Sequence, residues 1–234
     1  MTAILIQNTI VSLIVTSITF AVVFILNYLN KKNSITTEVS RKVVHIGAGT
    51  LYLALYFYSD YGYFSKYLNI FPYFLWTSIL LWKSQSKSSV QQKDDFLVGI
   101  ITRNHRQSEL LRGPLFFNIV IIICGTVLYK TILGSMIMGI LTWGDGLAAV
   151  IGVRYGSRRK IYRTKTLDGL LTFFIVAIIA SIIYTSILVD FQSICLWKIC
   201  AISFVTAVIE TLSPSDIDNL TIPLSIIILY YFLF

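Results

Sequence analysis

Long apolar stretches separated by short polar breaks are the feature that most restricts how this 234-residue chain can fold. A bilayer core about 30 Å thick is crossed by about twenty helical residues, and stretches of that order recur along the whole sequence. Only 13% of the residues are charged, against roughly 25% in a typical soluble domain. The sequence therefore excludes a soluble globular protein and predicts an all-α, polytopic bundle of transmembrane helices.

About eight spans are predicted, and a count of seven stays open because little more than Lys130 and Thr131 separates the fourth span from the fifth. The first span has no charged segment before it and no small-residue cleavage site, so we expect it to be retained in the mature protein. No soluble-domain boundary is found, which predicts a single integral membrane domain over 1–234. The expected spans lie near 3–29, 43–59, 63–82, 114–129, 131–152, 168–189, 194–211 and 217–234.

The distribution of basic residues predicts the orientation. With eight spans, all of the nineteen Lys and Arg residues except Lys66, Lys130 and Lys198 lie in connections on one side. The positive-inside rule places that side in the cytoplasm and both termini outside. Most of the net charge of +8 then reflects topology, and no nucleic-acid partner is expected. The protein is expected to be multi-pass, in the cell membrane of a prokaryote or in the endoplasmic reticulum or plastid of a eukaryote.

Asp145 is a residue that a simple membrane helix should not contain. It stands about six residues before the cytoplasmic end of the fifth span, which places it roughly 9 Å below that end. An acidic side chain near the centre of a span costs about 2.5–3.5 kcal/mol, and less nearer the edge. An interhelical salt bridge, a water-filled crevice, a metal ion or a substrate would offset this cost. The flanking Gly144 and Gly146 favour a ligand, because glycines let a ligand approach the backbone closely.

A stripe of small residues follows Asp145. Gly152 and Gly156 fall on one narrow face of the predicted helix, a pattern typical of close helix packing. The stripe also runs from a buried carboxylate into the basic segment 154–165, which would fit a ligand site. Lys165 and Thr166 come next, just before the sixth span. A point charge, a hydroxyl and unpaired N–H groups at a helix N-terminus suit a phosphate.

The connection between the last two spans contains acidic residues and no basic residue. Glu210 ends the seventh span, while Asp218 and Asn219 enter the eighth. Pro223 cannot donate to the carbonyl of Asn219, so that oxygen is left free beside the Asp218 carboxylate. Hard oxygen ligands in a kinked helix suit magnesium, and a simple kink is the alternative. The residues expected to form a helix cap in this connection are Ser213, Pro214 and Asp216.

Basic residues also open two helices in the first half of the chain. Arg41 and His45 share one helix face, and Lys42 lies within three residues of His45. Arg41 and Lys42 alone would be an ordinary cytoplasmic flank, but His45 lies a turn into the membrane. Arg112 opens the fourth span, and Glu109 three residues earlier would be placed to form an ion pair with it.

In this order, these motifs resemble the membrane-embedded family of CTP-dependent lipid-alcohol kinases, which includes phytol, farnesol and dolichol kinases. The segment 109–115 is closer to the phytol and farnesol branch. Two positions depart from the family pattern: Asp168, where glutamate is more usual, and Leu170, where a small residue is common. The matching segments are Arg41-Lys-Val-Val-His45, Glu109-Leu-Leu-Arg-Gly-Pro-Leu115, Gly144-Asp-Gly-Leu-Ala-Ala-Val-Ile-Gly152 with Gly156, Lys165-Thr-Leu-Asp-Gly169, and Glu210 with Ser213, Asp218, Asn219 and Pro223.

The resemblance implies transfer of the γ-phosphoryl group of CTP to the hydroxyl of an isoprenoid alcohol of the phytol, farnesol or geranylgeraniol type. The reaction is expected at the cytoplasmic membrane face with Mg²⁺ as cofactor. The expected metal ligands are Asp145, Asp218 and Glu210. The expected catalytic residues are Asp145, Lys165, Asp218 and His45, with His45 or Asp145 accepting the alcohol proton. The residues expected to bind the nucleotide are Arg41, Lys42, Arg112, Gly144, Gly146, Gly152, Gly156, Lys165, Thr166 and Asn219.

Three alternatives stay open at this point. A phosphatidate cytidylyltransferase has a similar Asp-containing helix and Lys-Thr-x-x-Gly motif, but its later Asp-x-x-x-x-Pro-Gly-His-Gly-Gly segment is absent here. A CTP-dependent diacylglycerol kinase would differ in its lipid acceptor. A transporter would need polar residues along a whole crossing, whereas the outer halves of these spans are almost purely apolar. The sequence does not specify the alcohol's chain length, CTP over another nucleotide, or the oligomeric state.

Overall fold

The computed structural model describes residues 2–59, 65–85, 95, 97–156, 159–189, 195–214 and 217–234. These residues are almost entirely helical, with one short pair of antiparallel strands. The chain divides into two compact units, Met1–Thr126 and Val127–Phe234, and each unit is described by itself. The helical class expected from the sequence is confirmed, whereas the single domain stays a prediction.

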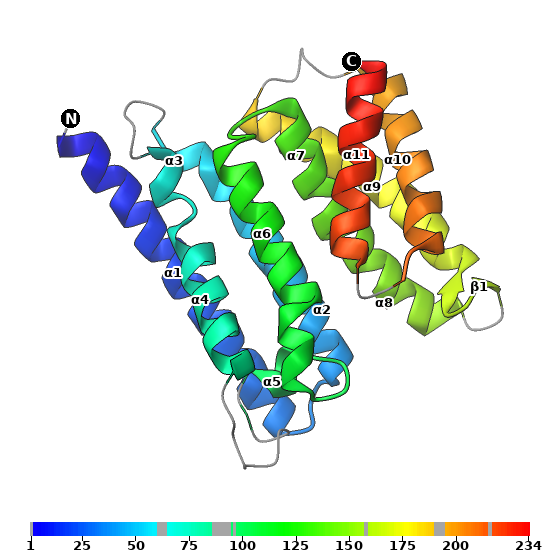
Figure 1. Ribbon diagram of the computed structural model, residues 1–234, viewed down its shortest axis with the longest axis horizontal. Helices are drawn as coiled ribbons and strands as arrows, with labels where there is room; N and C mark the ends of the chain where they lie inside the picture. The colour runs from blue at the N-terminus through cyan, green and yellow to red at the C-terminus, as the bar shows by residue number, and fades with distance from the viewer. Residues whose placement is uncertain are drawn as a thin grey trace. The chain divides into compact units, whose positions relative to one another are not determined.

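The first unit is built on four longer helices, of which α1 contacts both α2 and α4, and α4 also contacts α6 (Figure 1). Thr36 caps α2 by accepting a hydrogen bond from the Val39 N–H. The last part of the predicted second span is a 3₁₀ helix, η1. The elements of this unit are α1 (Thr2–Lys31), α2 (Thr37–Thr50), η1 (Leu51–Phe57), α3 (Ser65–Leu68), α4 (Phe71–Gln85), α5 (Val98–Ile101), η3 (Gln107–Leu111) and α6 (Gly113–Thr126).

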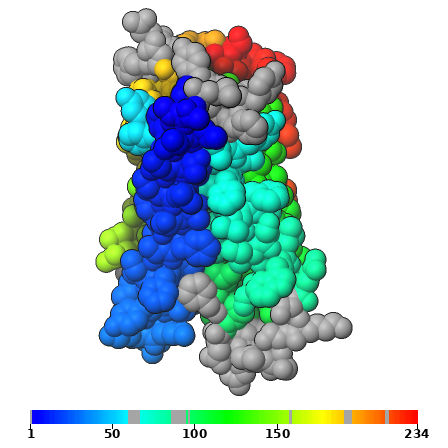
Figure 2. Space-filling model, turned by 90° about the vertical axis from the view of Figure 1, so that its left-hand side faces the viewer, coloured from blue at the N-terminus to red at the C-terminus, as the bar shows by residue number. Residues whose placement is uncertain are grey.

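The packing of α1 shows why its apolar sequence suits a membrane. Val15 and Val23 are buried, while Ile6 and Phe24 leave more than half of their surface exposed. Figure 2 shows α1, in blue, lying against α4, in blue-green, on one face of the molecule. Trp76 of α4 donates a hydrogen bond to the Thr19 hydroxyl of α1 over 2.9 Å. The helix therefore has a packed side and an apolar outer side, which is the arrangement that lipid requires.

The second unit is arranged around α9, which contacts α7, α8 and α10, while α11 packs on α10 and α7 (Figure 1). A single π-helical turn, η4, joins α7 to α8 without a break in the span. In the strand pair, Lys160 faces Thr166 and Tyr162 faces Lys165. The elements of this unit are α7 (Ile132–Gly139), η4 (Ile140–Gly144), α8 (Asp145–Tyr155), β1 (Lys160–Tyr162), β2 (Lys165–Thr166), α9 (Leu167–Leu188), α10 (Leu196–Leu212) and α11 (Asp218–Leu233).

Four stretches of the described chain are long and apolar enough to cross a membrane. These findings support a protein with several spans, whereas the count of eight and the position of the termini stay predictions. The fourth and fifth predicted helices are separate, because Lys130 takes a φ of 49° and Thr131 caps the next helix by accepting from the Gly134 N–H. The four stretches are Thr2–Lys31, Gln107–Thr126, Ile132–Tyr155 and Leu167–Leu188.

Gly139 tests the packing of α7 on α9. A Cβ at this position would lie 2.8 Å from the Ala180 carbonyl oxygen, whereas a Cβ at Gly47 of α2 would meet nothing within 4 Å. We expect Gly139→Ala to lower the midpoint temperature of unfolding in detergent by several degrees, since overpacking costs about 1–3 kcal/mol. Gly47→Ala is the matched control and should not lower it, because alanine is the better helix former. Equal midpoints for the two variants would contradict this account of the helix contact.

Candidate functional site

Lys165 is the partly buried centre of a polar cluster in the second unit. It lies in β2, directly before the residue that caps α9, and its ammonium forms an ion pair with the Glu210 carboxylate of α10. Burial lowers the pKa of Lys165, but the negative charges of Glu210, Asp145 and Asp218 outweigh burial and hold that pKa above its ordinary value. Lys165 is therefore a cation held among three carboxylates that come from α8, α10 and α11.

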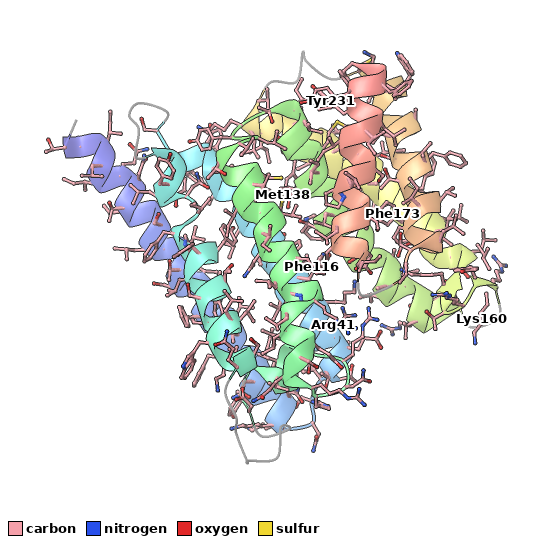
Figure 3. All side chains as sticks on the ribbon, in the orientation of Figure 1. Arg41, Phe116, Met138, Lys160, Phe173 and Tyr231 are labelled. Atoms are coloured by element: carbon pink, nitrogen blue, oxygen red, sulfur yellow. The ribbon has the colours of Figure 1, made fainter. Side chains whose placement is uncertain are left out.

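Asp145 lies at the first position of α8, directly after the π-helical turn η4. Only 4% of its surface is exposed. Such turns are rare, and they occur frequently at functional sites because they shift the side chains of a helix out of regular register. Gly144 ends this turn, and a Cβ there would lie 3.5 Å from the ring of Phe173 of α9, which is labelled in Figure 3. This is an ordinary van der Waals distance, so the turn places the carboxylate where η4 packs on α9, without a tight contact at Gly144.

Asp218 and Asn219 begin α11, and both are buried. The Asp218 carboxylate accepts a hydrogen bond from the Asn219 N–H over 2.9 Å. Pro223 lies inside this helix, as the sequence indicated. The cap predicted at Ser213 is wrong: Ser213 ends α10, and its N–H bonds the carbonyls of Ile209 and Glu210.

The start of α11 agrees with the last predicted span, near 217–234, but Pro214 is not the first helical residue that the predicted cap required. The helix begins four residues after Pro214, at Asp218 itself, with Ile217 before it. Asp216, the predicted capping acid, lies outside the described residues. Asp218 therefore occupies the first turn of a helix, where the helix dipole favours a negative charge.

The glycine stripe has a packing role. A Cβ on Gly156 would lie 2.5 Å from the Thr166 Cβ, and one on Gly152 would lie 3.0 Å from the Thr166 hydroxyl oxygen. That hydroxyl caps α9 by accepting a hydrogen bond from the Gly169 N–H over 3.1 Å. The stripe therefore lets α8 contact the start of α9, beside Lys165. The predicted contacts of the two glycines and Thr166 with a nucleotide stay predictions, as does that of the buried Gly146.

The predicted basic residues of the first unit lie on α2 and at the start of α6. Arg41, labelled in Figure 3, and Lys42 are in α2, and Lys42 is buried. The His45 ring stacks on Phe117 of α6 with 4.0 Å between ring centroids. Arg112 lies between η3 and α6, where its side chain is exposed. The structure thus brings α2 and α6 together through His45, a contact that sequence spacing could not predict.

Glu109 has a structural task at the entrance to η3. Its carboxylate accepts hydrogen bonds from the backbone N–H groups of Arg103, over 2.6 Å, and Asn104, over 3.0 Å. The side-chain amide of Asn104 donates a third bond over 2.9 Å. Glu109 therefore fixes the turn that leads into η3 and then α6.

The donor chemistry of the cluster fits a magnesium ion that is bound together with phosphates. No three His, Cys, Asp or Glu side chains of the described chain are close enough together to hold a metal on their own. Glu210 is engaged by Lys165, which leaves the predicted role of Glu210 as a ligand untested. However, Mg²⁺ in nucleotide sites is usually held by one or two carboxylates, with phosphates and water completing its shell. Asp145 and Asp218, with the side-chain oxygen of Asn219, are donors of that kind.

Sequence reasoning identified the charged members of the cluster from their misplaced charges, but it missed their pairing. Glu210 and Lys165 are 45 residues apart in the chain, and no periodicity connects them. It also missed the π-helical turn, which carries no recognised sequence signal. A further miss is Asn118, a buried polar residue within α6. An amide inside an otherwise apolar span was the signal that could have found it.

Several phytol kinases are similar to the chain over most of its length. It is 30% identical over 226 residues to "Probable phytol kinase 1, chloroplastic" of Glycine max, which covers 92% of this chain and 73% of the relative. It is 27% identical over 228 residues to "Phytol kinase 1, chloroplastic" of Arabidopsis thaliana, with 92% and 73% covered. The phytol kinase of Synechocystis sp. is 29% identical over 206 residues, with 87% and 83% covered. No family model and no solved structure matches. Similarity of this extent shows that the chain belongs to the phytol kinase family.

Proposed function

We propose that this kinase transfers the γ-phosphoryl group of CTP to the hydroxyl of an isoprenoid alcohol of the phytol, farnesol or geranylgeraniol type. The observation that carries the proposal is the cluster of Lys165 with three buried carboxylates, in a chain that belongs to the phytol kinase family. Phosphoryl transfer depends mainly on in-line positioning and on neutralisation of the phosphate charge. A partly buried cation among buried carboxylates is suited to the second requirement, the neutralisation of charge.

Asp145 and Asp218 are assigned to Mg²⁺, and Asn219 to a further oxygen contact. When bound, the ion would neutralise negative charge on the phosphate oxygens of the nucleotide. Three carboxylates beside one ammonium give the cluster an excess of negative charge, which favours a divalent cation. Lys165 is assigned to a phosphate of CTP, and Glu210 holds its ammonium group in place.

The basic residues of the first unit are assigned to phosphate recognition. The guanidinium groups of Arg41 and Arg112 can bind two phosphate oxygens at once, while Lys42 offers a point charge. His45 and Asp145 are the two candidates for accepting the proton of the alcohol. The stacking of His45 on Phe117 fixes the plane of its imidazole, which suits a group that must accept a proton in a defined direction.

The donor and the acceptor can be tested in purified enzyme in detergent. Each γ-labelled nucleoside triphosphate is supplied in turn with farnesol, geranylgeraniol, phytol or a long polyprenol. We expect label to pass from CTP to a prenyl monophosphate, with release of CDP. Release of pyrophosphate would indicate a cytidylyltransferase, and transfer to diacylglycerol alone would indicate a different lipid kinase. Either result would overturn the proposal.

The metal assignment predicts the behaviour of Asp145→Asn and Asp218→Asn. Each variant keeps the size of the side chain but loses a charged oxygen ligand, so we expect kcat to fall by at least about 100-fold. The Mg²⁺ concentration that gives half-maximal rate should rise wherever activity is still measurable. Asp95→Asn is the matched control, because Asp95 is also paired with a lysine, Lys83, at 2.5 Å. Full activity of Asp145→Asn at low Mg²⁺ would refute the assignment.

Glu210→Gln should change the pH dependence of the reaction. The Glu210 carboxylate raises the pKa of Lys165, and burial lowers it. Removal of the carboxylate therefore lets the ammonium group lose its proton at a lower pH. We expect the alkaline decline of kcat/KM for CTP to move to lower pH in Glu210→Gln but not in Asp95→Asn. An unchanged profile would show that Lys165 does not need Glu210 to stay charged.

A further inference from the structure

The first unit contains an apolar pocket bounded by α1, α2, η1, α4, α5 and α6. Its empty volume is about 640 Å³, a figure that includes the open mouth. Apolar residues supply most of its wall, and Val23, Leu51, Leu80 and Phe117 are examples. A wall of this kind would fit an aliphatic chain, and none of the residues that line it offers a charge to the phosphates of a nucleotide.

One polar side chain in this wall stands out by its hydrogen bonding. The Thr19 hydroxyl accepts from the Trp76 indole over 2.9 Å, and the Tyr73 hydroxyl donates to the Ala48 carbonyl over 3.2 Å. Asn118 is 92% buried in the same wall, and its amide has no hydrogen-bond partner within the described chain. The amide is not fully buried, because the side chain borders the open space of the pocket. The pocket therefore offers one donor and acceptor group to a bound molecule.

The two helices that form much of the wall carry their basic residues at their N-terminal ends. Arg41 precedes Gly47 by six residues on α2, and Arg112 precedes Asn118 by six residues along α6. At 1.5 Å per residue, each basic residue lies roughly 9 Å along the helix from the wall position. The predicted phosphate-binding residues and the pocket thus share the same two helices, with the charges at one end.

Gly47 sets the width of the pocket on the α2 side. It lines the pocket, and a Cβ at this position would meet no atom within 4 Å. A larger side chain here would therefore extend into empty space and fill it, without a backbone clash. Size and polarity of the pocket can thus be changed independently, at Gly47 and at Asn118.

We propose that this pocket binds the isoprenoid alcohol, with the hydrocarbon chain along the apolar wall and the hydroxyl hydrogen-bonded to the Asn118 amide. The inference rests on the proposed function, and it adds the substrate-binding residues. An alcohol offers both a donor and an acceptor, which a side-chain amide can satisfy with its own acceptor and donor. The acyl chain of a membrane lipid would fill the same apolar wall but would leave the amide unsatisfied.

The decisive variant is Asn118→Leu, which keeps the volume and removes the amide. If the amide awaits a substrate hydroxyl, the variant should unfold at the same or a higher temperature, since the leucine replaces a polar group that has no partner in an apolar wall. Its KM for farnesol should rise about three- to tenfold, while its KM for CTP stays unchanged. A purely structural role for Asn118 predicts the reverse: a lower unfolding temperature with an unchanged KM for farnesol.

Gly47→Leu tests the chain-binding part of the pocket. We expect its KM to rise more for phytol than for farnesol, because less space remains for the longer chain. Ile123→Phe is the matched control: it adds bulk on α6, at a side chain that is 44% exposed and outside the pocket wall. Equal changes for both alcohols in Gly47→Leu would overturn the assignment of the pocket to the chain.

A binding measurement separates the two proposals. A farnesol analogue with a diazirine group is photolysed with the wild-type enzyme, and the labelled residues are identified by mass spectrometry. Label on α2, α4 or α6 around the pocket, displaced by farnesol and reduced in Gly47→Leu, would support the inference whatever the phosphoryl donor proves to be. Label elsewhere, or displacement only by phospholipid, would overturn it. Wild-type enzyme that phosphorylates no isoprenoid alcohol would instead overturn the proposed function.

Discussion

The cost of placing carboxylates inside an apolar helical bundle controls the arrangement of the second unit. Asp145, Glu210 and Asp218 are each at most 5% exposed, and such groups persist only where cations or hydrogen bonds offset the lost hydration. Lys165 meets that requirement from a strand pair that is held against α8 by glycine contacts. Three features together hold the Lys165 ammonium group in position: the strand pair, the small-residue stripe and the start of α9. A bound nucleotide and its metal would enter a region where the charges are already fixed in place.

Much of the helical fold could be predicted, because bilayer thickness fixes the length of an apolar stretch and glycine, proline and threonine mark where it ends. The fifth and sixth predicted spans agree with Ile132–Tyr155 and Leu167–Leu188 to within a few residues. The 3₁₀ helix η1 and the π-helical turn η4 were not predicted, since apolar periodicity does not distinguish hydrogen bonds to the third, fourth or fifth residue. The strand pair was missed as well, because its five residues were assigned to a basic loop.

The candidate site shows where sequence reasoning reaches its limit. A charge inside a span is conspicuous, so Asp145 and Asp218 could be selected from the sequence alone. Which groups meet depends on side-chain directions and helix crossings that no spacing encodes, and so the pairing of Glu210 with Lys165 needed coordinates. The prediction of a cap at Ser213 failed for a related reason. Serine before proline fits the start of a helix, but here the backbone N–H of Ser213 donates hydrogen bonds to the last carbonyls of α10.

The two kinds of chemistry in this chain have different consequences for specificity. In the charged cluster, loss of Lys165 would remove the cation that offsets three carboxylates, so this position can vary little without loss of stability. An apolar wall discriminates weakly, because one methylene changes binding by only about 1–3 kcal/mol. A single amide such as Asn118 can require a hydroxyl, but it cannot measure the length of the chain beyond it. Selection among isoprenoid alcohols should therefore depend on the volume beside Gly47, where one side chain decides how much hydrocarbon the pocket can enclose.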